Sequence, residues 1–414
     1  MFESLGIIRS YKLPFLKTYW RENEVSAIFN CLVRNKMVVG PETKKFEDRI
    51  GDRFKTKFAF ATNSGRSAIQ VILESMLSEK DKREVLVPSF GCTGIIQPII
   101  QAGLTPVFVD ISEDLNISPD SVEDKITKNT KAIIVPSLCG KPANWIRFKK
   151  IANKKDLFLI DDASQSVGAK YRGKFLGTLG DAGVFSFTLG KIISSTGGGM
   201  VLTDSRYLYD EILNRKINNE RYLPVLQRTF RTLMLGPYRR YGLPLFSISN
   251  LKNKIFSRTD LSFEVAKMSN IDASIGLEQM KSIDKIIQLR RRNAKILDEG
   301  LSCITEIELP EYTKDHIFTK YIIQFNKLSK HSGALYPREL NEFSSFLAKK
   351  GIETEWTYTP LHLRKQYSRF YDSSLPTTEK IWYKCITLPV NPNFNEEQME
   401  YIVSTVKKHF ISNA

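Results

Sequence analysis

Apolar residues follow two periods along the chain, one typical of helices and one typical of strands. The segment from Glu22 to Val33 places Val25, Ile28 and Leu32 on one face of a helix. Between such helical segments lie short apolar runs, which predict strands at 58–61, 85–88, 106–110, 132–136, 157–160, 183–187 and 200–203. Because strands separated by helical segments form βαβ units, this order predicts an α/β fold with a mainly parallel sheet.

The pattern changes after about residue 300. A strand is expected at 321–325, a helix at 337–350 and an amphipathic helix at the end of the chain. A chain of 414 residues is long enough for one large domain and one smaller domain. We therefore expect a large domain over 1–300, flanked by helices, and a smaller C-terminal α+β domain over 301–414.

Candidate chemistry gathers between residues 156 and 199. One predicted strand ends in two carboxylates, Asp161 and Asp162, and a later strand leads to a lone lysine, Lys191, followed by three glycines. Ligands of open α/β sheets bind outside the carboxyl ends of the strands. A lysine there can form an imine with an aldehyde, and a carboxylate can keep a pyridine nitrogen protonated, which is how proteins hold pyridoxal phosphate. Taken alone, Lys191 would be an ordinary surface lysine.

A glycine-containing turn follows the first predicted strand. It contains Ser64, Gly65 and Arg66 and leads directly into an apolar-periodic helix. The first backbone N–H groups of a helix have no partner within the helix, so such a turn is typical of a phosphate-binding site.

Together these segments resemble the DegT/DnrJ-type sugar aminotransferases, which have the aspartate aminotransferase fold (fold type I of the pyridoxal phosphate enzymes). The resemblance rests on the acid-Asp-Ala-x-Gln segment at 161–165 and on Phe-Ser-Phe-x-x-x-Lys at 185–191, which is followed by a Gly-Gly segment. Gly-Pro-Glu-x-x-x-Phe-Glu at 40–47 and Tyr-Thr-Pro-Leu-His at 358–362 extend it over nearly the whole chain.

The resemblance implies a role for each matching residue. Lys191 would bind the cofactor covalently and then move the proton, and Asp162 would face the ring nitrogen. Gln165 would contact the oxygen side of the ring, and Ser186 with the turn 64–66 would bind the phosphate. The implied reaction is ping-pong amine transfer from an amino acid, with glutamate expected, to a keto sugar that is linked to a nucleotide. The resemblance also implies a homodimer.

Three positions depart from the family pattern. The usual threonine of the phosphate turn is Arg66, which could replace the hydroxyl by a charge-assisted contact or could point to solvent. The aromatic ring that usually stacks on the cofactor aligns with Cys92, although Phe90 lies close enough to substitute. The asparagine that usually reaches the neighbouring subunit's site is Val265, so no contact from a second subunit is assigned.

The stretch 215–258 also departs from the family. It has many aromatic and apolar residues, the single acid Glu220, and the basic residues Arg215, Lys216, Arg221, Arg228, Arg231, Arg239, Arg240, Lys252, Lys254 and Arg258. Such a mixture is compatible with a long structured loop, a subunit contact, a loop over an anionic substrate or an interfacial membrane segment. Peripheral membrane contact through this stretch is therefore an open hypothesis.

Composition narrows the function classes only a little. The formal net charge of +16 favours anionic partners, but no nucleic-acid-binding motif is present, and no apolar run reaches the length of a membrane span. The N-terminus lacks the pattern of a signal peptide. The five cysteines are scattered without a CxxC pair, so we expect no metal site and a reducing, cytoplasmic location.

Two other functions stay open at this point. A sugar dehydratase could use the same fold, although dehydratases of this family typically replace the cofactor lysine, often with histidine. A non-catalytic, regulatory member is the second, because Arg66, Cys92 and Val265 are unusual. For His362 we favour a structural or substrate-edge role over acid–base chemistry, since Lys191 can move the proton itself.

Overall fold

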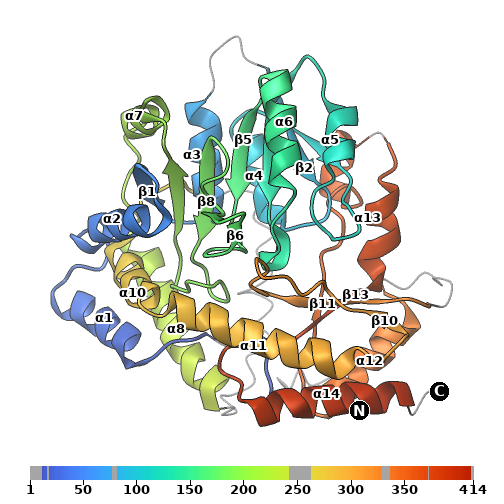
Figure 1. Ribbon diagram of the computed structural model, residues 1–414. Helices are drawn as coiled ribbons and strands as arrows, with labels where there is room; N and C mark the ends of the chain where they lie inside the picture. The colour runs from blue at the N-terminus through green and yellow to red at the C-terminus, as the bar shows by residue number, and fades with distance from the viewer. Residues whose placement is uncertain are drawn as a thin grey trace.

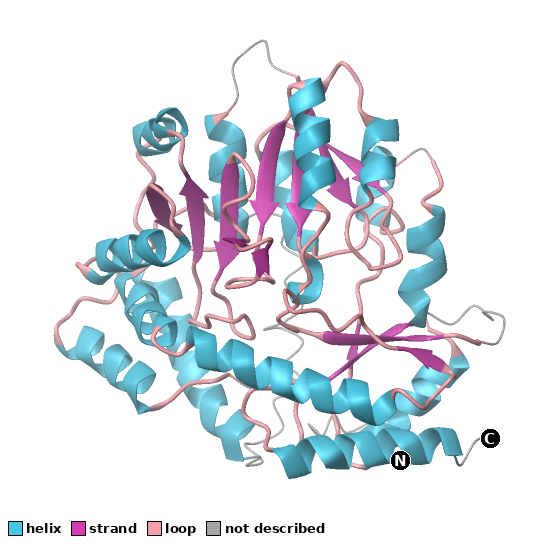
Figure 2. Cartoon of the chain, in the orientation of Figure 1, coloured by secondary structure: helices cyan, strands magenta, loops and turns pink. Residues whose placement is uncertain are grey.

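A seven-stranded sheet organises the larger part of the protein. The computed structural model describes residues 12–15, 18–76, 82–241, 263–328, 336–371 and 373–411, with side chains described except at 234–241. The strand order is β1-β9-β8-β5-β4-β2-β3 (Figures 1 and 2). The strands are β1 (Phe58–Thr62), β2 (Glu84–Pro88), β3 (Thr105–Val109), β4 (Thr130–Pro136), β5 (Phe158–Asp162), β8 (Ala182–Ser186) and β9 (Gly199–Thr203).

Helices cover both faces of this sheet because strand side chains alternate between the faces. In β4, Ile133 and Val135 pack into one apolar core, and Ala132 and Ile134 pack into the other. The first core includes residues of α2 (Glu42–Phe54), α5 (Pro119–Lys125), α6 (Trp145–Lys155) and α10 (Asn270–Met280). The second includes residues of α3 (Gly65–Ser75), α4 (Ile96–Gln101) and α7 (Arg206–Asn214).

The smaller sheet is built from the last third of the chain. Its order is β10-β11-β13-β12, formed by β10 (Ile307–Glu308), β11 (Tyr321–Phe325), β13 (Cys385–Leu388) and β12 (Glu355–Trp356). Its core includes α11 (Ile283–Leu301), α12 (Arg338–Lys349) and α14 (Glu396–Ile411), and Figure 1 shows α11 running below both sheets, next to α14. Leu13, near the N-terminus, packs in this core as well, so the smaller core includes residues from both ends of the chain. The predicted domain boundary at residue 300 stays a prediction.

Shorter elements complete the chain. They are the hairpin β6 (Lys170–Tyr171) and β7 (Lys174–Phe175), the helix α13 (Pro376–Ile381), and the 3₁₀ turns η2 (Thr93–Ile95), η3 (Leu138–Gly140), η4 (Lys365–Phe370) and η5 (Trp382–Lys384).

The direction of the strands decides where functional residues meet. The pairs β2–β3, β2–β4, β4–β5 and β5–β8 are parallel, which confirms the predicted mainly parallel sheet. Only β9 runs opposite to its neighbours β8 and β1. The carboxyl ends of β1, β2, β4, β5 and β8 therefore lie along one edge of the sheet, together with the beginning of β9.

The stretch 215–258 begins with a long helix. Helix α8 (Tyr222–Tyr241) packs Val225 against Ile28 of α1 (Glu22–Val33) and against Ile271 and Ile275 of α10. Tyr222, Leu223 and Phe230 are exposed on α8. Residues 242–262, and the side chains of Arg239 and Arg240, lie outside what the structure describes. In the described part of the chain, no helix is long and apolar enough to cross a membrane.

Candidate active site

The predicted site residues all follow the strand ends at this one edge. Ser64 and Gly65 follow β1, Phe90 and Cys92 follow β2, and Asp162 and Gln165 end or follow β5. Ser186 is the last residue of β8, and Lys191 stands five residues beyond it. The parallel arrangement thus brings together residues from four separate segments.

Lys191 lies in a tightly held turn between β8 and β9. The hydroxyl of Ser194 donates to the carbonyl oxygen of Lys191 at 2.8 Å and accepts from the N–H of Gly190 at 3.2 Å. Burial lowers the pKa of the Lys191 amine below its ordinary value. Among the charged groups, Asp162 opposes this shift and Lys320 adds to it. The amine is therefore biased toward the neutral form, which is the nucleophile.

The two aspartates of β5 have different surroundings. Asp161 is buried and accepts from the backbone N–H groups of Gly177 at 2.6 Å and Leu179 at 3.1 Å, so it holds a neighbouring loop. Burial raises the pKa of Asp161 to about 7. Asp162 is partly exposed, and one of its oxygens accepts from the N–H of Ser164 at 3.0 Å. Asp162 is thus the carboxylate that a ligand at the sheet edge can reach.

The turn at residues 64–66 lies where β1, β8 and β9 come close together at the start of α3. Ser64 caps α3 by accepting from the N–H of Ser67 at 3.1 Å. A Cβ atom at Gly199 would lie 2.4 Å from the backbone of Ser64, and one at Gly65 would lie 3.0 Å from the Cβ of Ser186. Only glycines allow this close approach of β1, β8 and β9. The backbone N–H groups at the start of α3 and the Ser186 hydroxyl fit a phosphate group.

Arg66 neither points to solvent nor is fully buried. Its Nη1 donates to Oε1 of Gln97 at 3.1 Å, and its guanidinium lies over the ring of Phe263, 4.8 Å from the ring centre. Burial lowers the pKa of Arg66 below its ordinary value. Its contact with a phosphate group stays a prediction.

The two candidates for ring stacking differ in exposure. Phe90 is 1% exposed and packs edge-on against Tyr358, with ring centres 5.7 Å apart. Cys92 is exposed and acts electrostatically on Lys191. In this structure the accessible side chain of the loop is therefore that of Cys92, and stacking by Phe90 would require its ring to be uncovered.

Gln165 leads to residues that the sequence analysis did not single out. Its Nε2 donates to the hydroxyl oxygen of Tyr358 at 3.0 Å, and its Oε1 accepts from the N–H of Cys139 at 3.3 Å. The Lys320 amine lies over the Tyr358 ring, 4.9 Å from its centre, and forms an ion pair with Glu355. The one sequence signal for this group was the motif at 358–362, which contains Tyr358 as well as His362.

His362 is held by neighbouring protein groups, and its structural or substrate-edge role stays a prediction. It is 2% exposed, its Nδ1 is hydrogen-bonded to the hydroxyl of Ser89, and its Nε2 lies 3.3 Å from Oε1 of Glu379. Burial lowers the pKa of His362. It holds α13 against the loop after β2.

A second unpredicted feature is an ion cluster beneath the Lys191 turn. Arg228 of α8 forms ion pairs with Glu220 and with Asp272, a side chain with no exposed surface. Asp272 also accepts from the N–H of Gly197 at 2.8 Å and from the hydroxyls of Ser195 and Thr196. The cluster ties the beginning of α8 to the residues that follow Lys191.

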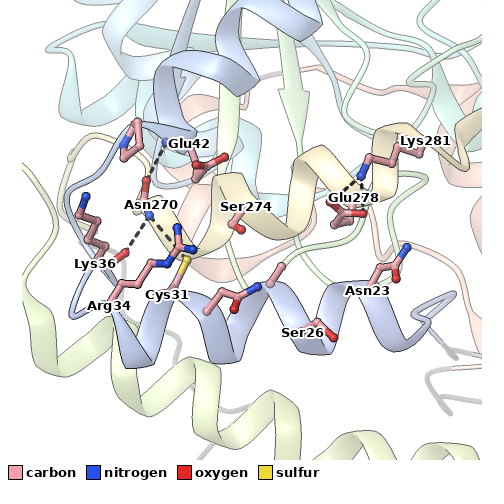
Figure 3. A pocket seen from close by; sticks show the side chains of 13 residues that line it. Asn23, Ser26, Cys31, Arg34, Lys36, Glu42, Asn270, Ser274, Glu278 and Lys281 are labelled. Carbon is pink, nitrogen blue, oxygen red and sulfur yellow. Dashed lines mark hydrogen bonds and ion pairs between the residues drawn. The ribbon is translucent and has the colours of Figure 1, made fainter.

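A separate cavity of about 410 Å³ lies between α1 and α10 (Figure 3). Its lining is polar and includes Asn23, Cys31, Glu42, Ser274 and Glu278. None of the predicted cofactor-binding residues lines it.

Comparisons with known proteins find relatives that match nearly the whole chain. Residues 19–407 match a model of the DegT/DnrJ/EryC1/StrS aminotransferase family. GDP-perosamine synthase of Escherichia coli O157:H7 is 29% identical over 373 residues, covering 90% of this chain and 91% of that protein. A GDP-4-keto-6-deoxy-D-mannose 3-dehydratase of Yersinia pseudotuberculosis is 27% identical over 373 residues, covering 87% of this chain and 88% of that protein.

A solved structure confirms the predicted fold. The aminotransferase PseC of Helicobacter pylori, described as involved in the biosynthesis of pseudoaminic acid, superposes with a TM-score of 0.77 at 21% identity, covering 97% of this chain and 99% of PseC. The match over 19–407 also confirms the predicted family and its reaction class. The chain belongs to the DegT/DnrJ/EryC1/StrS aminotransferase family.

Proposed function

We propose that the protein is a pyridoxal phosphate-dependent aminotransferase that moves an amino group from an amino acid, with glutamate as the expected donor, to a nucleotide-linked keto sugar. The observation that carries the proposal is the meeting of Lys191, Asp162 and the turn at Ser64–Gly65 along one sheet edge. The five cysteines form no sequence pattern of disulfides, which supports a cytoplasmic enzyme.

The residues present fit this cofactor. The start of α3 and Ser186 would bind its phosphate, Gln165 would face the oxygen side of the ring, and Asp162 would keep the ring nitrogen protonated. When bound, the cofactor supplies a carbonyl group for the amine and a ring that stabilises negative charge. Lys191, with its lowered pKa, is the nucleophile and then the general base that moves a proton between carbon atoms.

The acceptor class follows from the relatives. GDP-perosamine synthase and the Yersinia dehydratase both carry a GDP-linked sugar in their names. A net charge of +16 favours the pyrophosphate of such a substrate. The presence of Lys191 supports amine transfer over dehydration, because both half-reactions of transamination need its amine.

The test is incubation of the protein with pyridoxal phosphate, glutamate and a GDP-linked 4-keto-6-deoxy sugar, followed by mass spectrometry of the nucleotide sugar. We expect the keto oxygen to be replaced by an amino group and 2-oxoglutarate to form in equal amount. Lys191→Ala serves as the control and should give neither product. A nucleotide sugar that loses a hydroxyl oxygen and gains no nitrogen would support the dehydratase instead, and binding without any reaction would support the regulatory function.

We further propose that the enzyme is a homodimer, and that the exposed residues Tyr222, Leu223 and Phe230 of α8 contact either the second subunit or an anionic membrane surface. Arg215, Arg221 and Arg228 already form ion pairs within the chain. Their charges are thus matched by protein carboxylates rather than left for anionic lipid, which supports the subunit contact. The basic character of the rest of the stretch supports the peripheral membrane contact.

One pair of measurements separates these contacts. Sedimentation equilibrium should show a dimer for the wild type and a monomer for Leu223→Ser with Phe230→Ser if α8 lies in the interface. Vesicle co-sedimentation with and without anionic lipid should show binding that the same two substitutions remove if α8 meets a membrane. A dimer that withstands both substitutions, together with no vesicle binding, would contradict both roles of α8.

A further inference from the structure

The turn that carries Lys191 is closed by the side chain of Ser194. The Ser194 hydroxyl donates to the carbonyl oxygen of Lys191 at 2.8 Å and accepts from the N–H of Gly190 at 3.2 Å. These two bonds hold the backbone on both sides of the Lys191 side chain. The Lys191 turn is therefore only as well fixed as Ser194 itself.

The backbone of Ser194 is held by two side chains from distant parts of the sequence. Its N–H donates to Oε1 of Gln279 in α10 at 3.3 Å, and its carbonyl oxygen accepts from Nε1 of Trp20 at 2.8 Å. Ser194 is 2% exposed, and Gln279 is fully buried. The N–H, the carbonyl oxygen and the hydroxyl of Ser194 thus all have partners within the protein, as buried polar groups require.

Gln279 has partners on both sides of its amide group. Its Nε2 donates to the carbonyl oxygen of Tyr19 at 2.8 Å and to Oε1 of Glu24 at 2.6 Å. Glu24 is buried as well, and its other oxygen accepts from the N–H of Arg21 at the start of α1. A buried amide that is bonded through both its oxygen and its nitrogen has one preferred orientation. Gln279 therefore presents its oxygen to Ser194 from a fixed position.

The same face of α10 also holds the residues that follow Ser194. Asp272 precedes Gln279 by seven residues, which is about two helical turns. It accepts from the N–H of Gly197 at 2.8 Å and from the hydroxyl of Ser195 at 2.9 Å. Helix α10 thus fixes this segment at two points, and the point nearer to Lys191 in the sequence is the one that Gln279 holds.

We propose that Gln279 is a positioning residue for Lys191. Its hydrogen bond to the N–H of Ser194 fixes the hydroxyl that closes the Lys191 turn, and so holds the Lys191 amine where it can attack a bound aldehyde. Gln279 acts on Lys191 through Ser194. The inference rests on the proposed function, because it assigns Gln279 to the placement of the lysine that would bind the cofactor.

The first measurement is hydrogen exchange of the protein without cofactor, read by mass spectrometry on peptides that cover residues 188–196. Gln279→Met keeps the length of the side chain and loses its hydrogen bonds. We expect residues 188–196 to exchange about tenfold faster in this variant than in the wild type, because buried hydrogen bonds that limit local opening are lost.

Glu278→Met is the matched control for this measurement. Glu278 is the neighbouring residue of α10, and it pairs with the exposed Lys281 on the side of the polar cavity (Figure 3). The control should exchange like the wild type at residues 188–196. Wild-type exchange of these residues in folded Gln279→Met would overturn the proposal.

The second measurement separates placement of the Lys191 amine from affinity for the cofactor. Pyridoxal phosphate is mixed with each protein, and the appearance of the absorption band of the lysine-linked cofactor is followed in time. Pyridoxine phosphate, which has an alcohol in place of the aldehyde, measures binding without reaction. In Gln279→Met we expect the band to form about tenfold to a hundredfold more slowly, as for a misplaced reacting group, with unchanged affinity for pyridoxine phosphate. An equal loss of both would indicate a general structural role and would overturn the proposal.

A second variant keeps the proposal testable if Gln279→Met does not fold. Ser194→Ala removes the hydroxyl that contacts the backbone of Lys191 and leaves the bonds of Gln279 to Tyr19 and Glu24 in place. It should slow formation of the band as Gln279→Met does, again with unchanged affinity for pyridoxine phosphate. A wild-type rate in Ser194→Ala would overturn the proposal, because no group would then be left through which Gln279 acts.

Hydrogen exchange distinguishes failure of this inference from failure of the proposed function, because it uses neither cofactor nor substrate. A wild-type protein that forms no band with pyridoxal phosphate would contradict the proposed function. Faster exchange of residues 188–196 in Gln279→Met would in that case still show that Gln279 fixes the Lys191 turn, and unchanged exchange would overturn the inference as well.

Discussion

Replacing Arg228 by glutamine is expected to lower the free energy of unfolding by about 3–5 kcal/mol, the cost of leaving a buried charge without its partner. Asp272 would be that charge, because its carboxylate has no exposed surface. Burial alone would raise the pKa of Asp272, but the Arg228 charge and the hydrogen bonds from Ser269 and Thr196 hold it below its ordinary value. Without Arg228, the carboxylate must stay ionised at a cost or bind a proton.

Urea denaturation followed by circular dichroism measures this change. Arg221→Gln is the matched control, because Arg221 precedes the same helix and pairs with Glu264, and both side chains are largely exposed. Exposed pairs contribute about 1 kcal/mol or less. We also expect Arg228→Gln to loosen the turn after Lys191, since Asp272 holds Ser195, Thr196 and Gly197. Equal unfolding free energies for the two variants would show that the cluster adds little to stability.

Replacing Asp162 by asparagine is expected to reduce the turnover of amine transfer by about 10²–10⁴-fold, the range for losing a group that controls protonation at the reacting centre. Asparagine keeps an acceptor for the N–H of Ser164, so the loop should stay in place. It cannot carry the negative charge that, in the proposed function, would keep the ring nitrogen protonated.

Steady-state kinetics with glutamate as donor would measure this loss. Asp156→Asn is the control, because Asp156 is exposed just before the other end of β5 and has a left-handed backbone, with φ of 52°, that asparagine tolerates. The control should keep wild-type turnover. Near wild-type turnover in Asp162→Asn would mean that this carboxylate does not serve the ring nitrogen.

The sequence predicted the residues that end the parallel strands and missed those that reach the site from elsewhere. Lys191, Asp162 and Ser186 end or follow predicted strands, and the parallel direction of β5 and β8 brings them to one edge; their roles stay predictions. The expected helix at 22–33 matches α1, since its apolar period is regular. The reversed direction of β9 was not predicted, because an apolar strand has the same sequence pattern whether its neighbours run parallel or antiparallel to it.

Arg228 and Lys320 illustrate what local patterns cannot show. Arg228 was one of ten basic residues in its stretch, and its partner Asp272 lies 44 residues further along the chain. Lys320 precedes a strand of the smaller sheet, and its connection to Gln165 through Tyr358 depends on how the two sheets meet. Glu220, the single acid of this stretch, forms an ion pair with Arg228. Its presence was the one signal in the sequence that a basic residue of the stretch has a partner within the protein.

The most direct test of the account is the visible absorption spectrum of the purified protein with pyridoxal phosphate, measured beside Lys191→Ala before and after glutamate is added. We predict an absorption band of the lysine-linked cofactor that the wild type shows, that Lys191→Ala lacks and that glutamate bleaches. A wild-type protein without any band that depends on Lys191 would contradict the proposed chemistry of the site.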